Sequence, residues 1–530
     1  MKWTRRDVLK GLGGLPIVGG IWWAGAADSI MNIEQRSEIL QYLNIEPSLP
    51  SGLPNIGGDP IRVGIVGFGI RGQQLSRALG FATKDWLKNM EEAAEKNPKH
   101  TALKVFLEQE KLNLNIVAVC DAFDVRAQLA IDSFSTDEIT VKRYPTHQEM
   151  IRSGNVDAIV IATPDHWHAP MAIDALENGV HVYVEKPMTH TVEETYRLRE
   201  AANISNAKLM VGHQHRQTLS FQTAQDVVKK GTLGHVSMIQ TNTNRNDDNG
   251  AWQYHIHEKA NEQTIDWDLF LGTAPKVPFN KEHFFRWRKW WSYGSGLSGD
   301  LLSHDYDRLN CVINMGIPES ITASGGIYTH RDGRNVPDVL QVNMEFPEFS
   351  SGSSQEKGKE KGMTFIYSAT LGNGFNRPTI LMGHDATMEL GNKLTIWPDG
   401  GSTKYAEMIE AHKMKPSVPI YQYDPAANVP DAVSSATSQY FADKGLMWTY
   451  IDGRRVDSTF LHLREWLSAI RNGGKLSCGI KEGFEEAITS HMTGISYKLG
   501  RKIEWDPSNE IIKPIEGIDF DEVLLSNPEI

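Results

Sequence analysis

The chain has 530 residues, of which 40% are hydrophobic and 23% charged, as in soluble globular proteins. This length exceeds one ordinary domain, so we expect two, each with its own core. The net charge of −12 and the lack of a long basic run exclude nucleic acid as an expected partner. Three widely spaced cysteines, Cys120, Cys311 and Cys478, provide neither a disulfide framework nor a zinc motif.

The first 27 residues have the pattern of an export signal. Arg5 and Arg6 precede an apolar, glycine-rich run over 11–27, which is typical of the bacterial twin-arginine signal. Small residues, Ala24-Gly25-Ala26, offer a cleavage site before Ala27. The sequence therefore predicts a protein that the twin-arginine translocase exports, already folded, to the periplasm. An ordinary secretory signal and an uncleaved membrane anchor are the alternatives.

After a surface lead-in over 28–59, apolar strands alternate with helices in a first domain spanning 60–216. We expect strands at Ile61–Val66, Asn115–Asp121, Ala158–Ala162, His181–Val184 and Lys208–Gly212, and helices at Pro170–Asn178 and Val192–Asn203. A polar, helical insertion is expected over Phe81–Asn113. Continuous apolar strands that alternate with helices predict a parallel Rossmann sheet with both faces covered.

The pattern changes after about Gly234. Longer alternating strands are expected at His235–Thr243, Ser320–Tyr328, Val339–Phe346, Thr364–Leu371 and Thr387–Leu390, with a flexible hairpin insertion at Ser350–Lys361. They predict an α/β second domain over 217–507 with a large, mostly antiparallel open sheet, followed by a tail over 508–530. Helices at Phe460–Gly473 and Gly483–Leu499 are expected to pack back across both domains.

A glycine motif follows the first strand. Gly67, Gly69 and Gly72 form Gly-x-Gly-x-x-Gly between this strand and a helix, which is the context of a dinucleotide-binding loop. The first glycine permits the turn, the second admits the pyrophosphate, and the third lets helix and strand pack closely. The predicted cofactor-binding loop is Gly67, Phe68, Gly69, Ile70, Arg71 and Gly72.

Asp121 ends the second predicted strand. A carboxylate at this place accepts hydrogen bonds from the adenosine ribose, which favours NAD over NADP. Its spacing from Gly72 is much longer than the roughly 20 residues usual for this motif, and the insertion at Phe81–Asn113 accounts for the excess. The alternative role for Asp121 is a helix N-cap.

Proton-transfer chemistry is indicated at two places. Lys186, in Glu185-Lys186-Pro187, ends a parallel strand at the edge where ligands bind in such sheets, within reach of a substrate hydroxyl. Asp300 and His304 follow a glycine-rich loop and are four residues apart, so they are expected to share a helix face. His304 would accept the hydroxyl proton, with Asp300 orienting it. The alternatives are a salt bridge for Glu185, an N-cap for Asp300 and a core position for His304.

These motifs, in this order, resemble those of the Gfo/Idh/MocA oxidoreductases, from Ile61 to about Pro507. The resemblance includes Ala162–His168, Glu185-Lys186-Pro187, Trp267–Gly272, Gly299–Asp307 and Gly500–Pro507. It implies catalytic residues at Lys186, Asp300 and His304, often with a cis bond before Pro187. It also implies an open C-terminal sheet that forms a homo-oligomer interface, and substrates that are sugars, cyclitols or their glycosides.

Further polar residues follow the predicted strands at the ligand edge. Thr163, Pro164, His168, Glu185 and Lys186 complete the expected cofactor-binding set. The expected substrate-binding set is His166, His213, His215, Arg216, Trp291 and Asp307. Hydrogen bonding to a sugar is favoured over metal binding, because no carboxylate or cysteine spacing supports a metal. Core packing is the alternative for the aromatic cluster of Trp287, Trp290 and Trp291.

The sequence thus predicts an exported, NAD-dependent oxidoreductase that acts on a hydroxyl of a sugar, cyclitol or glycoside. Because a protein outside the cytoplasm cannot draw on its NAD pool, the cofactor is expected to be tightly held. The main alternative is an NAD-dependent glycoside hydrolase or lyase that oxidises the sugar only transiently. A non-catalytic sugar-binding protein is a third reading, which the intact Lys186, Asp300 and His304 disfavour.

Overall fold

The computed structural model describes residues 37–45, 57–97, 100–247, 250–349, 361–424, 429–431, 448–451 and 454–526. The predicted signal segment Met1–Ala27 lies outside these residues. So does the predicted hairpin insertion Ser350–Lys361, apart from Lys361 itself. In the described part of the chain, no helix has both the length and the apolar character needed to cross a membrane.

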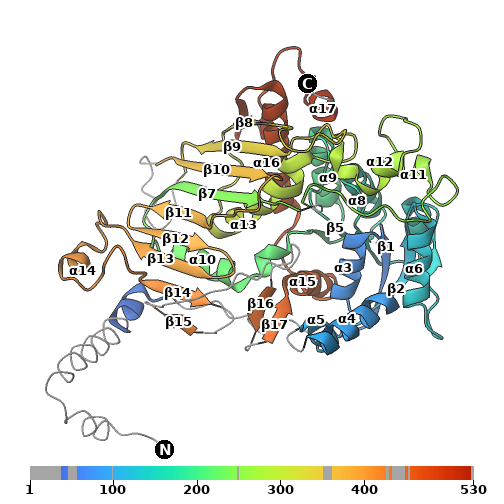
Figure 1. The fold of residues 1–530 in the computed structure, drawn as a ribbon, viewed down its shortest axis with the longest axis horizontal. Coiled ribbons are helices and arrows are strands. Elements are labelled where there is room, and N and C mark those ends of the chain that lie inside the picture. The colour runs from blue at the N-terminus through green and yellow to red at the C-terminus, as the bar shows by residue number, and fades with distance from the viewer. Residues whose placement is uncertain are drawn as a thin grey trace, which may run out of the picture.

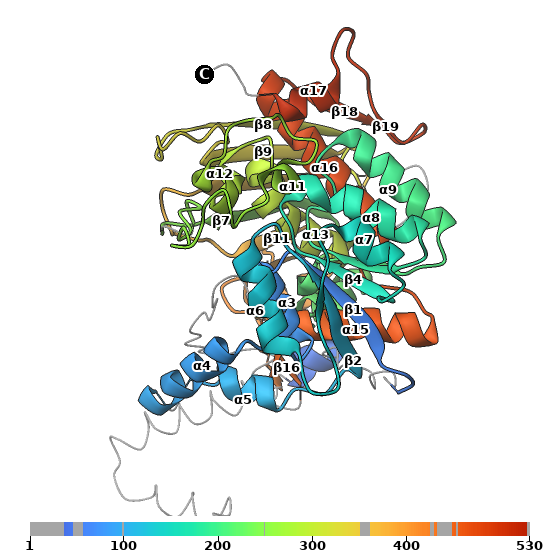
Figure 2. The same ribbon diagram turned by 90° about the vertical axis from the view of Figure 1, so that its right-hand side faces the viewer.

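A six-stranded parallel sheet forms the N-terminal domain, in the order β3-β2-β1-β4-β5-β6 (Figure 2). Its strands are β1 (Ile61–Val66), β2 (Leu114–Cys120), β3 (Lys142–Arg143), β4 (Ala158–Ile161), β5 (His181–Val184) and β6 (Leu209–Val211). Helices cover both faces: α3 (Ile70–Ala78), α6 (Asp124–Phe134), α7 (His147–Arg152), α8 (His168–Glu177) and α9 (Val192–Ile204). Every residue of β4 is buried, as expected for a strand between two helical layers. The predicted Rossmann sheet is confirmed.

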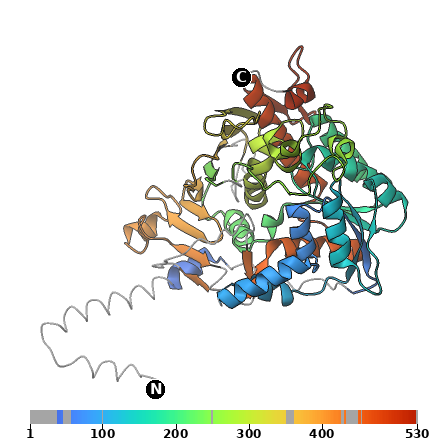
Figure 3. The same cartoon turned by 45° about the vertical axis from the view of Figure 1, so that its right-hand side comes forward.

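The predicted insertion before β2 is also helical. It contains α4 (Lys84–Lys96) and α5 (Ala102–Leu107), which lie at the margin of the domain (Figure 2 and Figure 3). The Thr83 side chain caps α4 by accepting a hydrogen bond from the backbone N–H of Trp86 at 3.2 Å. Trp86 packs on Phe106, with ring centroids 5.3 Å apart, and this contact joins the two helices. The insertion explains the long spacing between Gly72 and Asp121.

An eleven-stranded sheet forms the second domain within the described residues, in the order β15-β14-β13-β12-β11-β7-β10-β9-β8-β18-β19 (Figure 1). Its strands are β7 (Val236–Asn244), β8 (Ser320–Gly326), β9 (Val339–Phe346), β10 (Met363–Thr370), β11 (Thr379–Gly383), β12 (Ala386–Leu390), β13 (Leu394–Pro398), β14 (Tyr421–Asp424), β15 (Val429–Asp431), β18 (Ile503–Asp506) and β19 (Ile511–Ile512). Only the β7–β10 pair is parallel among its described pairings. The predicted, mostly antiparallel sheet is confirmed. Separately, β16 (Trp448–Ile451) pairs with β17 (Arg454–Asp457).

The remaining helices lie between the Rossmann strands, on the large sheet or at the junction of the two domains. They are η1 (Asp165–Trp167), η2 (Gln214–Gln217), α10 (Leu219–Lys229), α11 (Trp267–Leu271), α12 (Lys281–Phe285), η3 (Trp287–Lys289), the π-helical turn η4 (Ser298–Leu302), α13 (Ser303–Ile313), α14 (Ala406–Glu410), α15 (Ser458–Asn472), α16 (Ile480–Leu499) and α17 (Phe520–Leu525). Helix α16 contacts both β8 and α9, so it bridges the two domains, as predicted.

Helix α15 lies in the core of the first domain, although the sequence assigned 217–507 to the second. Phe460, Leu463 and Trp466 of α15 are buried with Val63 of β1 and Tyr183 of β5. The apolar face of α15 thus covers part of the Rossmann sheet. The lead-in is anchored in a similar way at the second domain, where residues 37–43 are helical and bury Ile39 and Leu43.

Candidate functional site

The glycine loop has the geometry of a dinucleotide-binding turn. Gly67 has φ +85°, and its N–H donates to the Cys120 carbonyl at 2.8 Å. A Cβ on Gly72 would lie 2.1 Å from the Gly67 carbonyl oxygen, so only glycine fits there. Gly69 is the N-cap of α3, and neither a capping side chain nor an acidic residue occupies the first turn. The start of α3 therefore leaves its N–H groups and positive dipole for a pyrophosphate.

Side chains of the loop point in different directions. Phe68 is buried against Phe134, with ring centroids 5.4 Å apart, and Ile70 is exposed. The backbone N–H of Phe68 donates to Oδ2 of Asp121 at 2.6 Å, and that of Phe123 donates to Oδ1 at 2.8 Å. Asp121 thus holds the loop against the end of β2.

Each Asp121 oxygen keeps acceptor capacity for a ribose hydroxyl. Burial raises the pKa of Asp121, and the charge of Arg126 opposes this shift. The N-cap of α6 is Phe123, so the helix-cap alternative for Asp121 is wrong.

Arg126 of α6 is a cation beside this pocket that the motifs did not indicate. Its guanidinium lies over the rings of Phe284 and Phe285, at 5.5 and 5.2 Å from their centroids. It is also the group nearest to Gly69, because a Cβ on Gly69 would lie 3.5 Å from its Nη1. Its place in the first turn of the helix that follows Asp121 is the sequence signal that could have found it.

Arg71 and Glu185 pair with each other. Arg71 Nε donates to Glu185 Oε1 at 2.7 Å, and Arg71 Nη2 donates to Gln214 at 3.3 Å. A Cβ on Gly212 would lie 2.8 Å from the Glu185 carboxylate, so this glycine makes room for the pair. The alternative of a salt bridge for Glu185 with a merely solvated Lys186 is confirmed only for Glu185, because Lys186 is buried and pairs with Asp300. The pair ties the start of α3 to the end of β5.

His168 ties the ends of β4 and β5 together. One ring nitrogen, Nδ1, lies 2.7 Å from the Pro187 carbonyl oxygen, and Nε2 lies 2.9 Å from that of Thr163. Pro164 forms the N-cap of η1, and the Lys186–Pro187 peptide bond is cis, as the resemblance implies. His168 therefore fixes the segment that carries Lys186.

Lys186 meets Asp300 across the two domains. Lys186 Nζ donates to the Asp300 carbonyl at 2.6 Å and lies 3.4 Å from its Oδ1. Arg288 Nε donates to the same Oδ1 at 2.9 Å, and Trp252 Nε1 donates to Oδ2 at 3.1 Å. Burial would raise the pKa of Asp300, but the charges of Arg288 and Lys186 lower it well below its ordinary value.

Asp300 does not orient His304, and that expectation is wrong. The described structure has no hydrogen bond between them, because the Asp300 carboxylate is taken up by Lys186, Arg288 and Trp252. The reason is local: residues 298–302 form a π-helical turn, so the four-residue spacing does not give the shared face of an α-helix. Arg288 and Trp252 were missed because nothing in the sequence links them to Asp300.

Three histidines, His304, His215 and His213, form a row beside Lys186. The ring centroids of His215 and His304 are 5.1 Å apart, and those of His213 and His304 are 5.9 Å apart. Burial lowers the pKa of His304 well below its ordinary value, and the charge of Lys186 lowers it further. His304 is therefore neutral near pH 7, as a general base requires. Among the described residues, no group of His, Cys, Asp and Glu is arranged to hold a metal ion.

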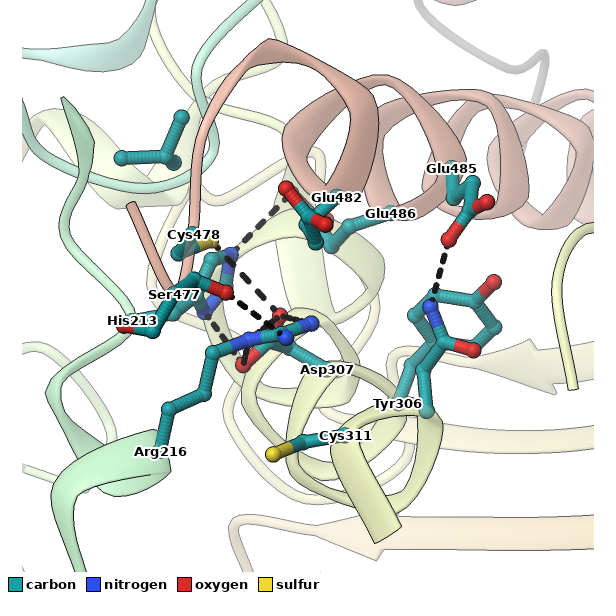
Figure 4. A network of polar contacts seen from close by, with 12 residues as sticks. His213, Arg216, Tyr306, Asp307, Cys311, Ser477, Cys478, Glu482, Glu485 and Glu486 are labelled. Carbon is teal, nitrogen blue, oxygen red and sulfur yellow. Dashed lines mark hydrogen bonds and ion pairs between the residues drawn. The ribbon is translucent and has the colours of Figure 1, made fainter. Parts of the chain in front are cut away.

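Arg216 and Asp307, predicted to bind substrate, instead form a buried ion pair (Figure 4). Arg216 Nε donates to Asp307 Oδ1 at 2.8 Å and to Oδ2 at 3.0 Å. Arg216 Nη1 donates to the Ser477 carbonyl at 2.9 Å. These groups are used within the protein, so the substrate-binding expectation is corrected for both residues.

His166 and Trp291 lie in apolar packing rather than in the histidine row. His166 Nε2 lies 2.9 Å from the Phe270 carbonyl oxygen, and burial lowers the pKa of His166 to about 4. Trp291 is buried, and Lys498 Nζ lies 3.9 Å from its ring centroid. Both side chains are buried with partners inside the protein, and their predicted contact with a substrate stays a prediction.

The fold and the site define a two-domain α/β protein built to bind a dinucleotide at the edge of its Rossmann sheet. Residues 61–213 match the family model GFO_IDH_MocA, described as "Oxidoreductase family, NAD-binding Rossmann fold". The Rossmann domain is therefore similar to the NAD-binding domain of this oxidoreductase family.

Three curated proteins illustrate the range of similar chains. The uncharacterized oxidoreductase YdgJ of Escherichia coli is 27% identical over 40% of this chain and 49% of its own. Levoglucosan dehydrogenase of Pseudarthrobacter phenanthrenivorans is 26% identical over 43% of this chain and 56% of its own. A glycosyl hydrolase family 109 protein of Shewanella woodyi is 28% identical over 28% of this chain and 35% of its own. The chain spans about half the length of the curated relatives that it matches.

Solved structures match over both domains. Levoglucosan dehydrogenase in complex with NADH and levoglucosan gives a TM-score of 0.53 at 17% identity, covering 84% of this chain and 99% of that one. The WlbA dehydrogenase of Bordetella pertussis, in complex with NADH and UDP-GlcNAcA, gives 0.51 at 16% identity, covering 84% and 99%. At such identities the likeness shows the fold alone.

Proposed function

We propose that the whole protein oxidises a hydroxyl group of a sugar, cyclitol or glycoside with NAD. One observation carries this proposal. Lys186, which Asp300 holds in place, lies near the neutral, buried His304 at the ligand-binding edge of the Rossmann sheet. An ammonium donor and a neutral imidazole acceptor are the groups that oxidation of an alcohol needs. The similarity to levoglucosan dehydrogenase supports a sugar-like substrate.

The cofactor would be held by the glycine loop and Asp121. The open N-terminus of α3 suits the pyrophosphate, and Asp121 suits a ribose with two free hydroxyls, so NAD is preferred over NADP. When bound, NAD supplies a hydride acceptor at its nicotinamide ring. Lys186, fixed by the cis peptide segment and His168, lies at the edge of the sheet where that ring is expected.

The chain's own residues account for the proton. His304 accepts it from the substrate hydroxyl, because its ring is neutral and its buried Nδ1 has no hydrogen-bond partner. Lys186 donates a hydrogen bond to the same oxygen, while Asp300, itself paired with Arg288, holds the ammonium in place. His215 also has buried ring nitrogens without hydrogen-bond partners, and it would bind a neighbouring hydroxyl.

A second candidate is redox-neutral cleavage of a glycoside, favoured by the similarity to glycosyl hydrolase family 109 proteins. Here the sugar is oxidised, loses a proton from the adjacent carbon, releases its aglycone, gains water and is reduced again. No NAD is consumed in this cycle.

One set of incubations separates the two candidates. Purified protein is first denatured gently and analysed by mass spectrometry for released NAD or NADH. Native protein is then mixed with sugars, cyclitols and chromogenic glycosides, with and without added NAD. NADH formation that depends on a sugar supports the oxidoreductase, whereas aglycone release without added NAD supports cleavage. A protein that releases no dinucleotide and changes no substrate would refute both.

Export and assembly remain proposals as well. The twin-arginine pattern at Arg5 and Arg6 supports periplasmic export by the twin-arginine translocase, with a signal that is cleaved or kept as an anchor. A homo-oligomer through the large sheet is supported by exposed outer-face residues such as Gln341 of β9 and Ile366 of β10. Size-exclusion chromatography with light scattering tests the oligomer, and a monomer would refute it.

A further inference from the structure

Glu486, in the middle of α16, is a buried acidic residue that forms no hydrogen bond to stabilise the fold. It is 1% exposed, and neither carboxylate oxygen has a hydrogen-bond partner. Its nearest charged partner is His213, whose Nε2 lies 3.5 Å from Oε2 (Figure 4). A buried carboxylate without hydrogen bonds is costly, so its retention calls for an explanation.

His213 lies between two carboxylates. Its Nδ1 is 3.7 Å from Asp307 Oδ2, but Asp307 is already neutralised by its ion pair with Arg216. Glu486 is therefore the carboxylate that can balance the positive charge of a proton on His213 or on the neighbouring histidine rings. His213 contacts His304 edge to face, with the rings 89° apart, and His304 contacts His215.

The other groups facing this row are mostly cations. Arg216 of η2, His462 of α15 and Cys478 before α16 lie around His213 and Asp307. The charges that act on His304 and His215 are those of Lys186 after β5, Arg71 of α3 and Arg308 of α13. Their positive charges disfavour a further proton on His304. A proton that enters this row therefore needs a local negative charge.

We propose that Glu486 is the counter-ion of the histidine row and, acting through His213, a positioning residue for the proposed oxidation. The substrate O–H bond would break and give its proton to His304. The C–H bond of the same carbon would break as well, with a C=O bond forming, and bound NAD would supply the hydride acceptor. The Glu486 carboxylate then stabilises the positive charge of the row. This inference rests on the proposed function for the source of the proton, but not for the charge balance itself.

Burial raises the pKa of Glu486, and the neighbouring His213 opposes this shift, so the negative charge on Glu486 depends on its contact with the histidine row. Removing the negative charge should lower the pKa of the row, because a protonated imidazole then loses its counter-ion. The acid limb of the kcat/KM profile, below which the base is protonated, should therefore move to lower pH. The proton that the row accepts should also be less stabilised.

The test uses Glu486→Gln, which removes the charge and keeps the shape. We expect kcat to fall at least tenfold, with an unchanged NAD affinity and an acid limb of kcat/KM moved down by about one pH unit or more. The control is Glu485→Gln on the same helix, because Glu485 accepts a hydrogen bond from Asn310 at 2.7 Å and its side chain points away from His213 (Figure 4). Glu485→Gln should leave both the limb and kcat near wild type.

A second readout needs no substrate. Carbon-13 labelled histidine rings are titrated by NMR in the purified full chain, with signals assigned from His213→Gln and His304→Gln. Glu486→Gln should move the row's titration to lower pH, and Glu486→Asp, which keeps the charge, should largely restore it if the glutamine variant folds poorly.

The readouts fail separately. If the histidine titrations are the same in wild type, Glu486→Gln and Glu485→Gln, the counter-ion role of Glu486 is refuted. A shifted titration in a protein that neither oxidises nor cleaves any sugar would instead overturn the proposed function and leave the counter-ion standing.

Discussion

Alanine at Gly72 is the sharpest test of the glycine loop. Its Cβ would lie 2.1 Å from the Gly67 carbonyl oxygen, although contacts below 3.0 Å are essentially never seen for a real Cβ. Because the clashing atom belongs to the backbone, rotation of a side chain cannot relieve the clash, and α3 must move away from the turn. Such overpacking costs about 3 kcal/mol of stability. We expect NAD affinity to fall at least 100-fold, about 2.7 kcal/mol, because the N–H groups of α3 move with the helix.

Gly69→Ala is the matched variant. Its Cβ would lie 3.5 Å from the nearest protein atom, Arg126 Nη1, an ordinary contact. Stability should therefore fall by at most about 1 kcal/mol, the cost of alanine at an N-cap. Affinity for NAD should still fall at least tenfold, because the new methyl group occupies the approach of the pyrophosphate.

Both variants are measured by urea unfolding and by calorimetric titration of NAD into protein stripped of cofactor. Wild-type affinity in Gly72→Ala, or in Gly69→Ala, would show that the pyrophosphate does not lie on this loop. Equal losses of stability in the two variants would show that the steric argument from the Gly67 carbonyl is wrong.

Three further predictions concern the cofactor, the chemistry and export. Lys186→Ala and His304→Ala should each lower kcat at least 100-fold while NAD stays bound, since general acid–base groups contribute about 10²–10⁴; near-normal turnover of His304→Ala would assign the base to another residue. Asp121→Ser should narrow the preference for NAD over NADP at least tenfold in binding titrations, because a carboxylate repels a 2′-phosphate; tighter NADP binding by the wild type would contradict this. Replacing Arg5 and Arg6 by lysine should leave folded, NAD-loaded protein in the cytoplasm; periplasmic protein after fractionation would indicate an ordinary secretory signal.

Much of the Rossmann sheet could be predicted because its strands are short, apolar and buried on both faces. The boundaries of β1, β5 and β9 agree with the prediction to the residue. The very short strands, such as β3 and β19, have too little pattern to stand out. Helix α15 was predicted as a helix but not as part of the first domain, because periodicity gives the buried face and not its partner.

The site was predicted unevenly for a similar reason. Lys186 and Asp300 belong to recognisable motifs, and in the structure they form an ion pair across the two domains. The roles of Arg216 and Asp307 could not be predicted, because an ion pair between separate elements leaves no mark in local spacing. Glu486 escaped notice because it belongs to no motif and lies among the buried residues of α16.

The position of α15 has a consequence for the order in which the molecule is made. During synthesis the ribosome completes β1 to β6 long before it reaches Phe460 and Trp466, so the nascent Rossmann sheet lacks part of its cover during synthesis of nearly half of the chain. A fragment that stops before α15 should expose apolar strand residues such as Val63 and Tyr183 and aggregate. Closure of this core therefore depends on nearly the whole polypeptide. Stable loading of a cofactor would accordingly report that translation has finished, which is a useful checkpoint for a chain proposed to be exported in its folded form.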